Sequence, residues 1–273
     1  MSLATDDDLL RNCVAGMQRG LEPQVEQALR QRTEAIDWRA APVAASLLEL
    51  RETRWEDVVR GHRAHRHAWH DELAERATIA DFAGFLLENW AFPAFLPLLV
   101  RTRTAQVVAA GRDAIDRNIA DEQTPVPHAN LMRRLVFAVK AKAGAEPRLM
   151  THQSLVDRTV VFYYGYYNDP WYLVGALYAT EALATYRVTR MGAGLRRLGL
   201  DPADLEFIRI HSACDEDHAR DWREDVIAAT VAARPALRAP IAQGVAACLE
   251  TSAAYFDELL ARAQSARRAG GAS

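Results

Sequence analysis

Apolar residues recur at intervals of three and four along almost the whole chain, which is the spacing of one face of an α-helix. Ala, Leu, Arg and Glu dominate, glycine is sparse, and the apolar–polar alternation of a half-buried strand is almost absent. The pattern predicts an all-α protein folded as an antiparallel bundle of long helices with short connections. The expected helices cover residues 6–35, 42–52, 55–78, 81–109, 111–122, 128–144, 148–167, 170–199, 203–233 and 238–267.

Residues that begin and end helices stand at several of these boundaries. Asp169 and Asp201 each precede a proline, which is the arrangement of an N-cap residue followed by proline at the first helical position. Gly144 and Gly199 stand where two helices are expected to stop. The segment 124–127 contains two prolines and separates two helices, because prolines so close together do not lie inside one helix.

The domain organisation follows from the absence of a linker composition between residues 36 and 54. A separately folding first domain is therefore not expected. Residues 1–53 are predicted to form a helical extension packed on a core bundle of residues 54–268. The final residues, 269–273, belong to the run ARRAGGAS and are expected to be a disordered tail.

The composition is that of a soluble globular protein. The 273 residues carry a net charge of −3, which gives no electrostatic reason to expect nucleic acid or a membrane as a partner. The most apolar run, residues 91–100, is too short to cross a bilayer and contains two prolines. Cys13, Cys214 and Cys248 are widely separated and odd in number, which favours a reducing compartment. Because the start is acidic where a secretory signal is basic, we expect a cytoplasmic protein, with a monomer or a homodimer left open.

The sharpest chemical signal is the pattern His-x3-Asp-x2-His at residues 211–218. On a helix, Asp215 lies about 40° from His211, and His218 lies about 20° on the other side. Phe207 and Trp222 continue the same stripe, as expected where a polar site lies in a bundle core. The alternative is a solvated helix face, since the surrounding sequence is rich in charge.

Two further segments supply candidate ligands. Glu181 is the only acid in a helix that is apolar almost all round, so it must be protonated, paired with an arginine or bound to a metal. Glu122 ends one helix and His128 begins the next, so both are able to point inward from a tight corner. The alternative for this pair is an ordinary surface acid and a polar helix start. Helical phase does not distinguish Glu122 from Asp121 as the ligand.

These candidates amount to three carboxylates and three histidines from three helical regions. A set of nitrogen and oxygen donors without thiolate suits two iron ions better than structural zinc, which prefers four ligands and often sulfur. The paired Glu-x-x-His motifs of ferritin-like proteins are absent, so a different bundle is indicated.

At this point the residues resemble the haem-oxygenase-like non-haem di-iron oxidases and oxygenases. The resemblance rests on Glu122 and His128, then Glu181, then the helix at residues 211–218, and it covers roughly residues 55–265. Thiaminase-type and pyrroloquinoline-quinone-synthesis proteins belong to the same superfamily. The resemblance implies a haem-oxygenase-like bundle of about seven core helices that activates O₂ without haem.

The resemblance also implies cofactors and an activity. Two Fe(II) ions are the implied cofactors, O₂ is the implied co-substrate, and no catalytic residue is implied beyond the metal ligands. The implied ligands are Glu122, His128, Glu181, His211, Asp215 and His218. Activities of such proteins include oxidative decarboxylation of fatty acids, N-oxygenation, and desaturation, fragmentation or cyclisation of amino acids. The implied substrate is a small carboxylate-bearing metabolite of a biosynthetic pathway, with an amino acid as the first candidate and a fatty acid as the second.

A substrate pocket is expected beside these ligands. Its candidate residues are Tyr178, Leu177, Val174, Phe207 and Trp222. One alternative function is a metal-free member of the same fold, of the thiaminase type or the quinone-cofactor-synthesis type. Another is a non-enzymatic helical interaction protein. True haem oxygenase is least favoured, because no glycine-rich helix that would admit a macrocycle is found in the sequence.

Two further segments are predicted to have surface or packing roles and no part in the metal site. Residues 61–70 place four histidines in one expected helix without matching acids in phase, so they are predicted to lie on a solvated or dimer-facing surface. The alternative is a functional role, since two pairs with i,i+3 spacing could bind a transition metal or supply a haem ligand. Residues 162–172 concentrate aromatic side chains, which are expected to pack in the core, with a pocket wall as the alternative.

Overall fold

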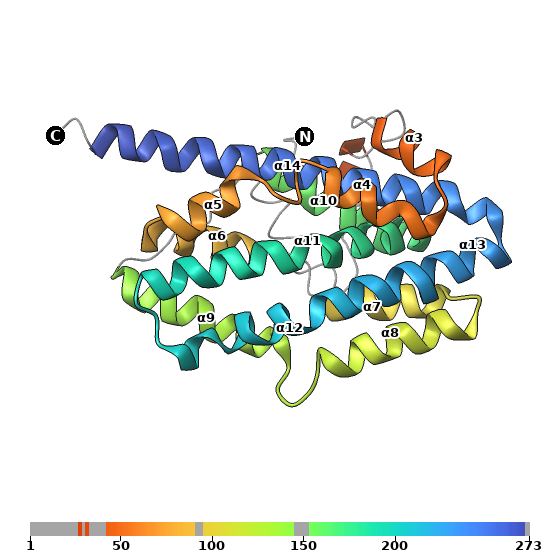
Figure 1. Ribbon diagram of the computed structural model, residues 1–273, viewed down its shortest axis with the longest axis horizontal. Helices are drawn as coiled ribbons and strands as arrows, with labels where there is room; N and C mark the ends of the chain where they lie inside the picture. Colours follow the sequence, from red (N-terminus) through yellow and green to blue (C-terminus); the bar gives the residue numbers. More distant parts are fainter. Residues whose placement is uncertain (1–26, 29–30, 33–41, 91–94, 145–152, 271–273) are drawn as a thin grey trace.

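The computed structural model describes residues 27–28, 31–32, 42–90, 95–144 and 153–270, and these residues contain helices and turns but no strand (Figure 1). The helices are α3 Pro42–Glu49, α4 Trp55–Gly61, α5 Ala68–Glu75, α6 Ile79–Trp90, α7 Phe95–Ala105, α8 Ala109–Asp121, α9 His128–Ala143, α10 Gln153–Tyr167, α11 Pro170–Arg197, α12 Glu206–Asp221, α13 Ala229–Ala233 and α14 Arg238–Gly270. Short 3₁₀ turns cover Glu52–Arg54, Pro202–Leu205 and Pro235–Leu237, and a π-helical segment covers Trp222–Ala228. The predicted all-α bundle is confirmed.

Helix α11 is the centre of the bundle. In Figure 1 it runs through the middle, with α14 along one side and α12 along the other. Side chains on every face of its first half are buried, which explains why that part of its sequence is apolar almost all round. The carboxylate of Asp169 caps its start by accepting hydrogen bonds from the backbone N–H groups of Trp171 (2.9 Å) and Tyr172 (3.2 Å). Gly199, with φ of 72°, follows its end as predicted.

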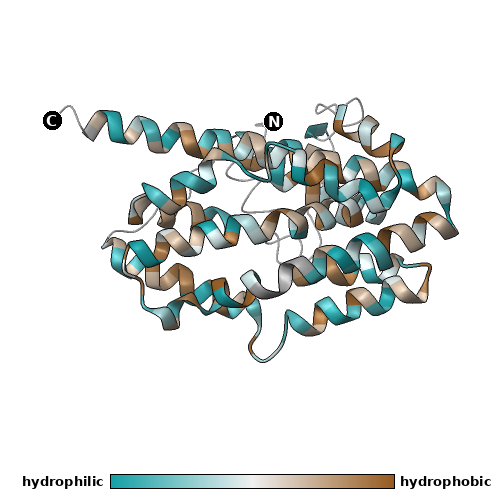
Figure 2. Ribbon diagram, viewed as in Figure 1, coloured by the Kyte–Doolittle hydropathy of each residue, from teal (hydrophilic) through white to brown (hydrophobic). Residues whose placement is uncertain are grey.

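The other helices are amphipathic. Figure 2 shows hydrophilic and hydrophobic residues alternating along most of them, as expected when one face packs inward and the other meets solvent. No helix among the described residues is long and apolar enough to cross a membrane.

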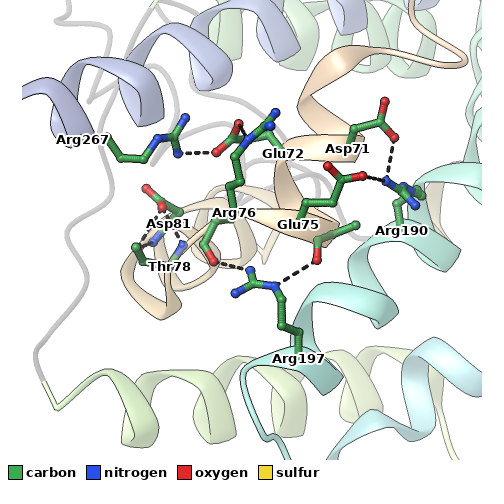
Figure 3. Close-up of polar contacts among 11 residues, drawn as sticks. Asp71, Glu72, Glu75, Arg76, Thr78, Asp81, Arg190, Arg197 and Arg267 are labelled. Carbon is green, nitrogen blue, oxygen red and sulfur yellow. Dashed lines mark hydrogen bonds and ion pairs between the residues drawn. The ribbon is translucent and has the colours of Figure 1, made fainter.

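Side chains of α5 tie this short helix to both α11 and α14 (Figure 3). Glu72 of α5 is fully buried and pairs with Arg267 of α14 and with Arg76, the latter at 3.0 Å. Arg190 of α11 pairs with Glu75 at 2.8 Å. These contacts from two long helices hold α5 against the bundle.

Glycines allow α11 and α14 to approach closely. A Cβ atom on Gly175 of α11 would lie 2.0 Å from the carbonyl oxygen of Ile241, and a Cβ on Gly244 of α14 would lie 1.9 Å from the carbonyl oxygen of Tyr172. Real Cβ atoms do not come so near to backbone oxygen. The contact between the two longest helices therefore requires glycine on both sides.

Several predicted helices are divided. The helix expected at 55–78 is wrong as a single element, because α4 ends at Gly61 and α5 begins at Ala68. The imidazole of His67 caps the start of α5 by accepting a hydrogen bond from the Trp69 N–H (3.1 Å). The spacing of apolar residues alone does not predict this helix start.

Two other expected helices are interrupted, and some boundaries fall outside the described residues. The helix expected at 81–109 separates into α6 and α7, and the one expected at 203–233 passes through the π-helical segment. Most of the helix expected at 6–35 lies outside the described residues. So do the first residues of the helix expected at 148–167. Helix α14 continues through Gly270, into the predicted tail 269–273.

The surface role predicted for the histidines of residues 61–70 is wrong. His70 is fully buried and His67 is 7% exposed. His67 Nε2 lies 3.0 Å from a carboxylate oxygen of Asp257, and His62 Nε2 lies 3.7 Å from one of Glu250. The acids come from α14 and not from the same helix, so a search for acids in phase did not find them.

Replacing Gly175 with alanine tests the contact between α11 and α14. We expect Gly175→Ala to lower the free energy of unfolding by roughly 2–3 kcal/mol, because backbone must move to admit the methyl group. Gly84→Ala is the matched control, since nothing lies within 4 Å of the added Cβ. In the interior of α6 this control is expected to raise stability by about 0.5–1 kcal/mol. Urea unfolding followed by circular dichroism measures both, and equal effects would contradict the close contact.

The burial of His70 predicts a dependence of stability on pH. Burial, together with the positive charge of Arg187, lowers the pKa of His70 to about 3. The unfolded chain, with a histidine pKa near 6.5, then binds more protons than the native chain below pH 6.5, so stability falls as pH decreases from about 6.5 toward 3. In His70→Gln this slope should be shallower by up to roughly 1.4 kcal/mol per pH unit. Urea unfolding at pH 6 and pH 5 measures the slopes, and identical slopes would refute the assignment.

Candidate metal centre

The first part of the site is formed where α8 gives way to α9. Glu122 is the C-terminal cap of α8, and His128 is the first residue of α9. The backbone N–H of His128 donates to the carbonyl oxygen of Glu122 (2.9 Å), which closes the proline-containing connection into a tight corner. His128 Nδ1 thereby lies 3.3 Å from Glu122 Oε1. The predicted inward corner is what the structure contains.

Helix α12 brings a third side chain to this corner. His211 Nε2 lies 3.9 Å from Glu122 Oε1, and the rings of His128 and His211 meet edge to face with centroids 4.8 Å apart. One ligand atom from each of Glu122, His128 and His211 lies within 4.8 Å of those of the other two. His128 Nδ1 is buried and makes no hydrogen bond. A buried nitrogen in that condition, facing a carboxylate and a second imidazole, fits a bound cation.

The orientation of His211 is set by the backbone of its own helix. Its Nδ1 lies 2.9 Å from the carbonyl oxygen of Phe207, and a carbonyl only accepts, so Nδ1 carries the hydrogen. Nε2 therefore presents its lone pair to Glu122. Burial lowers the pKa of His211 to about 4, so the ring is neutral at pH 7 and able to bind a metal.

A second group surrounds Glu181 on α11. The carboxylate is 5% exposed, and burial raises its pKa, while His218 and a hydrogen bond from Asn118 oppose the shift. Asn118 Nδ2 donates to Glu181 Oε1 (3.1 Å), and Glu181 Oε2 lies 3.9 Å from His218 Nδ1. The nearby charge of Glu122 also raises the pKa of Glu181.

The structure places Asp121 and Glu122 beside different histidines. Glu122 belongs to the group with His128 and His211, whereas Asp121 Oδ2 lies 3.1 Å from His218 Nε2. The two adjacent carboxylates thus serve different histidines of α12.

The remaining predicted ligand is Asp215. Its place in the sequence lies within α12, between His211 and His218, but its side chain lies outside what the structure describes. It stays a prediction from helical phase.

Sequence reasoning missed Asn118. This side chain is 3% exposed and stands one turn before Glu122 on α8, facing Glu181. The sequence signal for this residue was its position four residues before Glu122, which places both side chains on the same face of the helix.

The residues predicted to line a substrate pocket are in the core or at its edge. Val174, Leu177 and Tyr178 of α11 are buried, as is Trp222, and Phe207 is partly buried against the ring of His211 (centroids 4.0 Å apart). Tyr178 is 1% exposed and its hydroxyl makes no hydrogen bond among the described residues. Their role as a pocket remains a prediction.

Trp222 also begins the π-helical segment that follows the ligand-bearing part of α12. Segments of this kind often accompany functional sites. Arg117 of α8 pairs with Asp221 (2.8 Å) and Asp225 (3.1 Å) on either side of its start, and thereby ties α8 to α12.

The donors of both groups are imidazole nitrogens and carboxylate oxygens, a combination typical of redox-active iron and unlike the sulfur-rich sites of structural zinc. A family model described as that of an iron-containing redox enzyme matches residues 55–253, from the start of α4 into α14. The chain belongs to the iron-containing redox enzyme family. The haem-oxygenase-like fold expected from the sequence is thereby confirmed, and the protein is an oxidoreductase of an iron-dependent kind. The comparison with curated proteins finds no match.

Removing one imidazole tests whether the corner between α8 and α9 binds metal. In His211→Ala, anaerobic Fe(II) binding should weaken by roughly 100-fold or more, since losing a direct donor costs at least as much as losing an outer hydrogen-bond partner. His65→Ala is the control, because that imidazole lies against Tyr186, outside the three-residue group. Equilibrium titration with a ferrous indicator measures the affinity. Equal binding in the two variants would exclude His211 as a ligand.

Proposed function

We propose that this protein is a non-haem di-iron oxidase or oxygenase that uses O₂ to oxidise a small carboxylate-bearing metabolite. An amino acid is the first candidate substrate and a fatty acid the second. The observation that carries the proposal is the presence of two adjoining groups, each combining a carboxylate with histidine. One contains Glu122, His128 and His211, and the other contains Glu181 and His218.

The separations within these groups suit metal ions. Two ligand atoms that are each about 2.1 Å from one ion lie roughly 3–4 Å apart, depending on the angle between them. The distance from Glu122 Oε1 to His211 Nε2 is 3.9 Å, and the distance from Glu181 Oε2 to His218 Nδ1 is also 3.9 Å. Asp215, by its phase on α12, is proposed as the sixth ligand of the pair.

The chain's own residues would prepare the site for redox chemistry. Two ferrous ions, when bound, supply electrons for the reduction of O₂. His211, neutral at pH 7, offers a lone pair without adding charge, while the carboxylates compensate the charge of the ions. The burial of Glu181 and His128 excludes bulk water from reactive species.

One feature supports the binding of a small polar molecule in the interior. Tyr178 is 1% exposed and its hydroxyl makes no hydrogen bond among the described residues, so it offers one to a substrate carboxylate.

We also propose a division of the chain into an extension and a core. Residues 1–53 form a helical extension on the core of residues 54–268, which is supported by the packing of α3 against α14. The family match begins at residue 55, close to this boundary.

Iron content and O₂ uptake test the function. The wild type, given Fe(II) without air, should hold about two irons per chain, and O₂ consumption should rise with one of a panel of amino acids and fatty acids. Asp215→Ala and His218→Ala should each lose about one iron. Asp217→Ala is the matched control, because this exposed acid of α12 pairs with Arg220 at 2.8 Å.

The alternatives have different outcomes. Iron content near zero in the wild type would overturn the proposal in favour of a metal-free member of the fold. Two irons without O₂ uptake for any substrate would overturn the assignment to carboxylate-bearing metabolites.

A further inference from the structure

The two histidines of α12 present opposite ring nitrogens to the proposed metal ions. His211 uses Nδ1 to donate to the backbone of Phe207, which leaves Nε2 facing Glu122. His218 has the reverse arrangement, with Nε2 at 3.1 Å from Asp121 Oδ2 and Nδ1 at 3.9 Å from Glu181 Oε2. In each ring, one nitrogen is within hydrogen-bond distance of an outer acceptor and the other is at the same longer distance from a carboxylate of the site.

In the neutral form of the ring, which is the form that binds a metal, the distances decide which nitrogen of His218 carries the hydrogen. A neutral imidazole has one N–H, and an ionised carboxylate only accepts. A separation of 3.1 Å is that of a hydrogen bond, whereas 3.9 Å is too long for one. The hydrogen therefore lies on Nε2 and points to Asp121, and the lone pair of Nδ1 points to Glu181.

We propose that Asp121 is a positioning residue of the metal centre, which selects the Nε2–H tautomer of His218 and so turns Nδ1 toward Glu181. This inference rests on the proposed function. It separates the roles of two consecutive acids, since Glu122 binds metal directly while Asp121 acts through His218. A carboxylate held behind a metal-binding imidazole fixes its orientation and strengthens it as a donor.

The place of Asp121 suits this role. It is the last residue of α8, and its side chain is 57% exposed, so its charge is kept in water while one oxygen reaches the ring of the 9%-exposed His218 side chain. The ion pairs of Arg117 with Asp221 and Asp225 keep the end of α8 beside α12. For His211 the carbonyl of Phe207 has the same function without a side chain.

The first test needs no metal. Nitrogen-15 NMR of histidine in the metal-free protein distinguishes the two tautomers by the chemical shifts and couplings of the ring nitrogens. His218 should be the Nε2–H form and His211 the Nδ1–H form. In Asp121→Leu, the Nε2–H form of His218 should lose its dominance, while Asp121→Asn, whose amide oxygen still accepts, should retain it. Asp113→Asn, an exposed acid of α8, is the control.

The second test measures anaerobic Fe(II) binding. Asp121→Leu should weaken the affinity for one of the two irons by about 10–100-fold, yet full occupancy should return at saturating Fe(II). Asp121→Asn should recover most of the affinity. Loss of one iron at saturation in both variants would overturn the proposal, because Asp121 would then be a direct ligand. Unchanged affinity in Asp121→Leu would also overturn it.

The two tests separate this inference from the proposed function. A wild type that binds two irons but holds His218 as the Nδ1–H form would refute the positioning role of Asp121 alone. A wild type that binds no iron would refute the di-iron function, and the metal-directed role of Asp121 with it, even where the expected tautomer is found.

Discussion

The centre of this protein depends on the burial of one carboxylate on an apolar helix. Glu181 lies in the middle of α11, where packing on every face removes the water that would solvate its charge. Such a group persists only where donors or cations are directed at it. Asn118 donates a hydrogen bond to it from α8, and the ring of His218 lies beside it on α12, so both helices pack at this level of α11. The packing of the bundle at this level therefore also brings the residues of the candidate site together.

Much of the fold was readable from local signals. The acidic cap before α11 and the glycines after α9 and α11 are where the pattern placed them, because capping is decided by a few neighbouring residues. The histidines of residues 61–70 were misread for the opposite reason. Their acidic partners, Asp257 and Glu250, are remote in sequence, and only tertiary packing brings them near.

The candidate site shows the same division. Helical phase predicted that His211 and His218 lie on one stripe, and in the structure both face carboxylates from a single helix. It did not separate Asp121 from Glu122, because the helix ends between them and a fixed angle per residue no longer applies. Asn118 was not predicted, because a neutral amide was not among the metal-binding residue types considered. A buried acid nevertheless needs such a hydrogen-bond donor.

The glycine contact described above has a consequence for how the molecule can move. Gly175 and Gly244 lock α14 to one side of α11, while α12, which bears the histidines, lies along the other side (Figure 1). Backbone atoms of the two helices meet directly at this contact, whereas α12 meets α11 through side chains such as Ile208, which lies against Gly192. Redox chemistry requires ligands to adjust as charge changes at a metal. In this chain the helix that bears the histidines lies on the side of α11 where side chains form the contact, so that side is where such adjustment needs no backbone shift.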